Sequence, residues 1–254
     1  MVTAGATRGA RPRLALLAAV LAGLLGLGLC PDGGALPAGA ATLAFRLKPG
    51  NVYTYEVTTR ITSEFSVFEA KNQATTAATG TVRIRVLGAR QGLFILDLWE
   101  NENHTRRFLR PDGTVVGAPG EEGSRLPFFW TLPTGDWQPG QKHRLQKALA
   151  SGGREAAVPV AWELTLREID AKTGRARIDL AGEVGVPSDR AATRSITAKG
   201  IAFFNPQEGC FDQADWTVTY SLTLANKEIA VQRDVWKIQE TRQIGFRLKG
   251  VTNE

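Results

Sequence analysis

The feature that most constrains this fold is an alternation of apolar and polar residues with a period of two. In the stretch WTVTYSLTL the polar residues Thr and Ser alternate strictly with apolar or aromatic ones. The apolar and aromatic residues are Trp216, Val218, Tyr220, Leu222 and Leu224. Successive side chains of a β-strand point to opposite faces, so this pattern is typical of an antiparallel strand with one buried and one wet face.

The same period recurs in TVRIRVL, WELTLRE, GLFILDLW and several other runs between residues 43 and 249. Gly and Pro turn signals separate these runs and imply about ten strands. We therefore expect an all-β chain whose antiparallel curved sheet forms a half-barrel or open barrel, or folds as a two-sheet sandwich. Trp99, Trp162 and Trp216 lie in alternating runs and are expected in the core. Only residues 141–153, QKHRLQKALASGG, offer a helical alternative.

Two further patterns concern the order of the strands. The motif FRLK occurs at residues 45–48 and again at 246–249, which suggests that the first and last strands are neighbours. Pairing them would leave neither strand with an exposed, unpaired backbone edge. Similar hairpins also recur in the same order, VRIRVLGARQGLFILDLW and LTLREIDAKTGRARIDLAG, and indicate two similar halves at 43–125 and 126–249. Chance similarity between hairpins is the alternative explanation.

The first forty residues are typical of an export signal. Basic residues precede an unbroken apolar run from Leu14 to Leu29, which is short for a membrane-spanning helix. Two cleavage sites compete. Cys30 is placed as the acylated residue of a lipobox, but Leu29 stands where that motif has a small residue, whereas Ala38-Gly39-Ala40 fits ordinary cleavage but lies far beyond the apolar run. We expect a signal helix and tether over 1–40, a single β-rich domain over 41–254, and a periplasmic or envelope location, with membrane attachment only through Cys30.

Composition excludes several classes of function. The formal net charge of +6 falls by two when the leader is removed, and no run of Lys or Arg interleaved with aromatic residues remains, so a nucleic-acid surface is not expected. Cys210 then has no partner within the chain and is expected to be a packed apolar residue rather than a reactive thiol.

The stretches FRLKPGNVYTYEVTTRIT, LPTGDWQPGQ and GIAFFNPQEGCFDQADWTVTYSL resemble an uncharacterised family of secreted or lipid-anchored bacterial all-β proteins, a domain of unknown function. The likeness covers most of residues 43–248, and His143 stands where that family has an aromatic residue. A more distant likeness is to the half-barrel lipoprotein carriers of bacterial envelopes. The resemblance implies a curved β-sheet and an exported protein, and it implies no catalytic residues.

No constellation of residues indicates an enzyme. The chain has two histidines, His104 and His143, and neither has a second His or a Cys nearby in the sequence, so we expect no metal site and no cofactor. Nucleophile elbows, phosphate loops and dinucleotide fingerprints are missing from the sequence. A hydrolase would require one histidine to meet a carboxylate and a Ser, Thr or Cys in a cleft.

The densest aromatic cluster is Phe128, Phe129, Trp130 and Trp137, interrupted by prolines. Such a segment could line the mouth of a curved sheet and bind an apolar ligand, or it could simply pack as core. We therefore expect an exported, non-catalytic envelope protein that binds or carries an apolar ligand such as lipid. The alternative is a structural or protein-interaction module of the envelope, and an unrecognised hydrolase ranks third. A continuous apolar cavity favours a carrier, whereas a filled core with an exposed apolar patch favours an interaction module.

Overall fold

The computed structural model describes residues 40–67, 70–116, 129–149, 158–184, 192–225 and 235–254. They belong to one compact unit, Gly39–Glu254. Residues 1–39 of the expected signal segment, with Cys30, lie outside the described residues, as does Phe128. Within the described ranges, no helix is long and apolar enough to cross a bilayer. The strands are β1 (Ala41–Thr42), β2 (Asn51–Val67), β3 (Ala70–Arg90), β4 (Leu93–Glu100), β5 (Asn103–Leu109), β6 (Val115–Val116), β7 (Asp136–Trp137), β8 (Lys142–Leu149), β9 (Val158–Ile169), β10 (Ala176–Val184), β11 (Ala192–Asn205), β12 (Cys210–Ala225) and β13 (Val235–Asn253).

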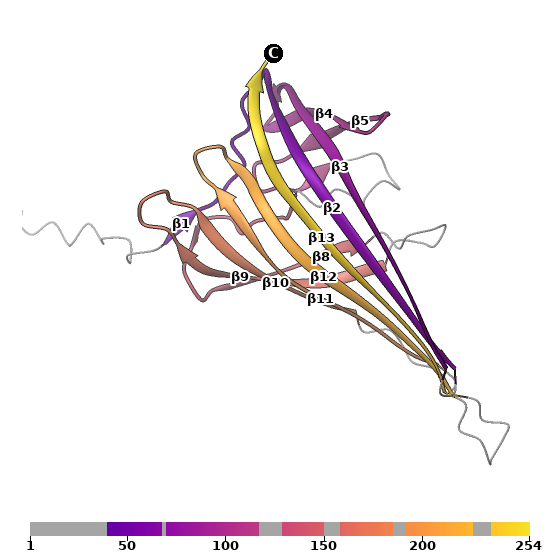
Figure 1. The fold of residues 1–254 in the computed structure, drawn as a ribbon. Coiled ribbons are helices and arrows are strands. Elements are labelled where there is room, and N and C mark those ends of the chain that lie inside the picture. The colour runs from indigo at the N-terminus through magenta and orange to yellow at the C-terminus, as the bar shows by residue number, and fades with distance from the viewer. Residues whose placement is uncertain (1–39, 68–69, 117–128, 150–157, 185–191, 226–234) are drawn as a thin grey trace, which may run out of the picture. The chain divides into compact units, whose positions relative to one another are not determined.

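Eleven of these strands form one antiparallel sheet in the order β6-β5-β4-β3-β2-β13-β12-β11-β10-β9-β8, and β1 pairs with β7. The strands bend along their length (Figure 1), and the sheet remains open, with β6 and β8 at its edges. The expected all-β, antiparallel, open architecture is thus confirmed. Each half of the strand order is a meander whose consecutive strands are neighbours in the sheet.

The two meanders meet at the centre of the sheet, where the last strand pairs with the first long strand. The register of β13 against β2 runs from Lys237 opposite Ser66 to Asn253 opposite Asn51. An ion pair between Lys249 Nζ and Glu56 Oε1, 2.8 Å apart, joins the two strands. This pairing leaves both β2 and β13 without a free edge. The repeated FRLK motif does not account for it, because the copy at 45–48 precedes β2 and lies outside the large sheet, whereas the copy at 246–249 lies within β13, where Phe246 faces Val57 and Leu248 faces Tyr55.

One face of the sheet carries the core. On β12 the side chains of Ala214, Trp216 and Val218 are buried, while Asp215 is exposed and Thr217 half-buried. We call the face bearing Trp216 the core face and the other the opposite face. The alternation visible in the sequence therefore predicts the correct buried residues here.

Two segments outside the large sheet cover the core face, residues 43–47 and 129–137. Phe45 is 1% exposed and lies edge-on to Phe204 with ring centroids 5.6 Å apart. The amide of Phe45 donates to the carbonyl of Pro111, and Leu132 donates to Asp112, so the backbone of each segment is tied to the β5–β6 connection. The core is filled by aromatic rings.

The structure corrects two details. Residues 142–149 form the edge strand β8, because Lys142 and Arg144 lie on one side and His143 and Leu145 on the other, a period of two that pairs with β9. Trp99 is outside the core. It is half-exposed on the opposite face of β4, because Leu96 and Leu98 occupy the core face of that strand.

Candidate functional site

The predicted aromatic site residues that the structure describes are part of the core. Phe129, Trp130 and Trp137 are 4%, 2% and 2% exposed. The Trp130 ring lies 5.3 Å from Phe211 and 5.4 Å from Trp216, measured between centroids. Trp137 donates from Nε1 to the carbonyl of Gln141 at 3.0 Å. A ligand-binding role for this segment stays a prediction.

A shallow pocket of about 510 Å³ lies beside this segment. Its apolar lining includes Leu43, Leu93, Pro111 and Pro133. It therefore adjoins the buried rings from outside, at the turn between β3 and β4.

The two histidines occupy different environments. His104 on β5 lies on the opposite face, with Nε2 3.3 Å from Asp97 Oδ1, and stacks on Trp99 at 5.0 Å. Hydrogen bonds from Arg106, at 2.8 and 3.1 Å, lower the pKa of Asp97, and His104 adds to this effect. His143 on β8 lies near Trp137 at 6.4 Å, and burial lowers its pKa.

Cys210 is a buried free thiol at the start of β12. Burial raises its pKa to about 12. The neighbouring Tyr55 is buried, donates from its hydroxyl to the carbonyl of Phe211 at 3.0 Å, and has a pKa raised by desolvation. Both groups are neutral at physiological pH. Among the described residues, no group of three or more His, Cys, Asp or Glu side chains could hold a metal ion.

The core face continues past the core along β2, β12 and β13 as a partly exposed apolar surface. We call it the end patch, and it consists of Phe65, Leu222, Leu224, Trp236 and Ile238. Trp236 and Ile238 are 46% and 39% exposed, and the Phe65 and Trp236 rings meet edge-to-face at 5.8 Å.

A polar belt on the same face separates the end patch from the core. Arg242 is paired with Glu240, and its guanidinium lies 5.1 Å from the centre of the Tyr220 ring. The side chains of Arg242 and Glu240 are only 16% and 29% exposed, so this ion pair is largely shielded from water.

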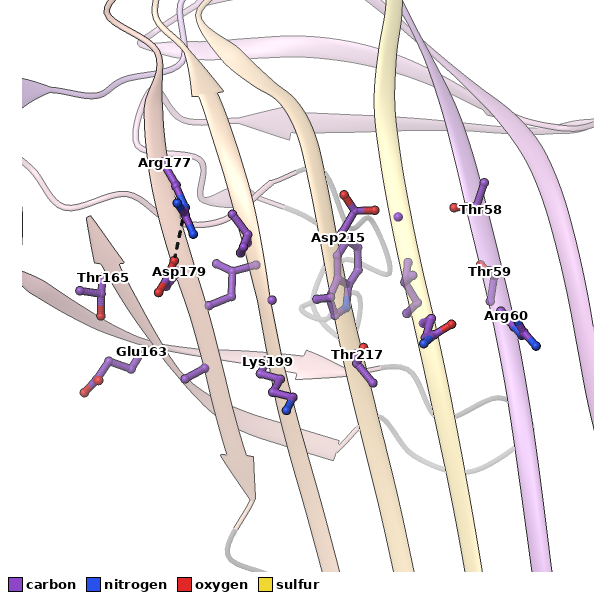
Figure 2. A pocket seen from close by; sticks show the side chains of 18 of the residues that line it. Thr58, Thr59, Arg60, Glu163, Thr165, Arg177, Asp179, Lys199, Asp215 and Thr217 are labelled. Atoms are coloured by element: carbon purple, nitrogen blue, oxygen red, sulfur yellow. Dashed lines mark ion pairs between the residues drawn. The ribbon is translucent and has the colours of Figure 1, made fainter. Parts of the chain in front are cut away.

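A pocket of about 930 Å³ lies mainly on the opposite face (Figure 2). The strand register shows that two adjacent rows of side chains line it. We call the pocket the trough. The first row crosses six strands from β2 to β9 and comprises Thr58, Gly245, Asp215, Ile201, Asp179 and Thr165. The second row crosses the same strands and comprises Arg60, Gln243, Thr217, Lys199, Ala181 and Glu163.

The β9 end of the trough is rich in ion pairs. Lys142 Nζ lies 2.7 Å from Glu163 Oε1, and this contact, followed by one from Arg144, lowers the pKa of Glu163. Arg167 Nε lies 2.6 Å from Asp179 Oδ2. Figure 2 also shows Arg177 beside Asp179, with Nε and Oδ1 4.0 Å apart.

Neither the end patch nor the trough is predicted by the sequence. The alternation shows which residues share a face, and this signal places Leu222 and Leu224 beside Trp216. The cross-strand register, however, brings together residues as distant as Arg60 and Gln243, and hydrophobic periodicity contains no register between remote strands.

No protein-family model matches this chain. No curated protein matches it either. Among solved structures, one described as "Lipid-protein interactions in lipovitellin" is similar with a TM-score of 0.42 and 12% sequence identity, covering 82% of this chain and 26% of that chain. This chain spans about a quarter of the length of that lipovitellin chain.

Proposed function

We propose that this protein is an exported, non-catalytic binding protein of the cell envelope, and that its ligand is apolar and of the lipid class. The observation that carries the proposal is the end patch, an apolar surface with Trp236 and Ile238 substantially exposed. Exposed contiguous apolar surface in a soluble domain marks a site of interaction with lipid or protein.

The position of the end patch within the sheet favours an apolar chain as its ligand. β2, β12 and β13 are neighbours in the sheet, and β13 is hydrogen-bonded on both sides. Its backbone N–H and C=O groups are therefore engaged and cannot recruit an added strand. What the patch offers is contact with aliphatic and aromatic side chains, which suits acyl chains.

A second candidate function is an interaction module that docks a partner protein on the same patch. The aromatic core around Trp130, which is 2% exposed and packs against Phe211 and Trp216, favours this alternative because buried rings occupy the core face where an enclosed carrier would hold its ligand.

The test uses the full chain and two double variants. W236S/I238S removes the apolar side chains of the patch. K237S/Q239S is the control, because Lys237 and Gln239 are the chain neighbours of Trp236 and Ile238 but lie on the opposite face of β13. Binding of a fluorescent C16 fatty acid and of phosphatidylglycerol vesicles is measured for each. Each lost side chain contributes about 1 kcal/mol of apolar contact, so we expect W236S/I238S to bind roughly tenfold or more weakly and the control to bind like the wild type.

Equal lipid binding by both double variants would contradict the lipid proposal. An absence of lipid binding by the wild type, together with patch-dependent capture of a defined envelope protein, would establish the interaction module instead.

Export and anchoring are tested separately by intact mass after fractionation. A mass that begins at Cys30 with added acyl groups supports the lipid anchor, whereas an unmodified mass that begins at Ala41 supports simple cleavage. A mass that retains Met1 would contradict export.

A further inference from the structure

The trough has the form of a site for an extended ligand that lies across the strands. Its rows cross six strands, and adjacent strands are about 4.8 Å apart, so the rows span about 24 Å. Short side chains such as Gly245, Thr217 and Ala181 alternate in these rows with longer charged ones. The short side chains leave space above the sheet between the longer ones.

Two cations in the trough stand apart from the ion pairs at its β9 end. Within the part of the chain that the structure describes, neither Arg60 nor Lys199 forms an ion pair with a carboxylate. They lie in the same row on β2 and β11, three strand spacings or about 14 Å apart. They therefore provide two separated positive charges for groups on a ligand.

Between and beside these cations the trough presents neutral and acidic hydrogen-bonding groups. Thr217 and Gln243 lie in the row between Arg60 and Lys199. In the next row a Cβ on Gly245 would be 2.6 Å from Asp215 Oδ1 and 2.9 Å from Thr58 Oγ1. The absence of a side chain at Gly245 thus allows a carboxylate and a hydroxyl to converge above β13.

We propose that the trough binds an acidic oligosaccharide, a hydroxyl-rich chain with carboxylate groups at intervals. Arg60 and Lys199 pair with two of its carboxylates, and Asp215 accepts hydrogen bonds from its hydroxyls. Such a chain therefore offers carboxylates to the two cations and hydroxyl donors to the Asp215 carboxylate. A nucleic acid fits less well, because it has a phosphate at every residue to be repelled by Asp215. The two rows also contain no aromatic side chain on which a base could stack, and Trp216, which adjoins the pocket, belongs to the core face and is only 6% exposed.

This site is independent of the proposed lipid site, because the trough lies mainly on the opposite face of the sheet from the end patch. Loss of one activity therefore leaves the other unchanged, and the variant W236S/I238S serves as a control for the trough.

The test is titration calorimetry of the full chain with three probes. These are a hexasaccharide of alternating glucuronate and N-acetylglucosamine, the neutral hexamer of N-acetylglucosamine, and the oligonucleotide dT6. We expect the acidic hexamer to bind at least tenfold more tightly than the other two. R60A and K199A each weaken its binding by about tenfold or more, as loss of a charge-assisted hydrogen bond implies, and the double variant weakens it further.

The matched control is K237A, which removes a lysine from the same face of β13 six residues away from Gln243 in the trough, and it should bind like the wild type. Circular dichroism shows whether each variant is folded. The proposal is overturned if the acidic hexamer does not bind at millimolar concentration, if the neutral hexamer binds equally well, if dT6 binds more tightly, or if K237A weakens binding as much as K199A.

Discussion

Trp130 offers the sharpest test of whether the aromatic segment is core or ligand-binding surface. The ring is 2% exposed and is in contact range of Phe211, Trp216 and Phe246, with centroid distances of 5.3, 5.4 and 6.2 Å. A buried tryptophan removes roughly 200 Å² from water, and at about 25 cal/mol per Å² this amounts to roughly 5 kcal/mol. Partial collapse of the cavity lowers the expected cost of Trp130→Ala to about 3–5 kcal/mol, a large share of the stability of a typical domain.

The assay is urea unfolding followed by far-ultraviolet circular dichroism, which does not depend on the fluorescence of the deleted ring. Trp236→Ala is the matched control, because it removes the same side chain from a site that is 46% exposed, and it should cost no more than about 1 kcal/mol. A cost below about 1 kcal/mol for Trp130→Ala would refute the packing argument and restore the binding role predicted for this segment.

Three further predictions concern single residues. The Cys210 thiol, buried and with its pKa raised to about 12, should resist iodoacetamide at pH 8 in the native protein and react at once in urea, and rapid native labelling would contradict its burial. Burial lowers the pKa of His143, so the unfolded chain binds a proton at this imidazole more readily than the folded chain does. The free energy of unfolding is therefore unaffected by this group above about pH 6.5 and decreases as the pH falls below that value. Thermal melts between pH 5 and 8 should therefore show a slope that His143→Phe removes, whereas an unchanged slope would rule this group out. Gly113→Ala should destabilise the fold by several kcal/mol, because φ at this residue is 89° and the new Cβ would lie 2.3 Å from the Trp130 carbonyl oxygen. Gly92→Ala is the control, because φ there is 75° but the space around the new Cβ is open, and it should cost about 1–2 kcal/mol. Equal losses of stability in urea unfolding would contradict the steric argument.

The sequence predicts the class of the fold and much of its core because alternation is a local signal. Trp162 and Trp216 are buried where the period places them. Trp99 follows the same period but lies on the other face, because alternation alone does not reveal which of two half-apolar faces is covered. That choice depends on segments such as 43–47, which have no regular pattern of their own.

The candidate sites depend on register, which a local pattern does not contain. Lys199 and Thr217 are cross-strand partners, and they share a row with Arg60 only through the pairing of β13 with β2. Both sites therefore follow from the topology of the sheet.

The central pairing of β2 with β13 has a consequence for how the chain acquires its structure. During synthesis β2 can pair with β3 as soon as the hairpin is made, but its other side must wait until β13, nearly two hundred residues later, has been made. The nascent meander therefore displays a seventeen-residue strand with one side of unsatisfied backbone, a strong template for misassembly. We therefore expect the slowest folding step to be the closure that joins β2 to β13 and with it the two halves of the sheet.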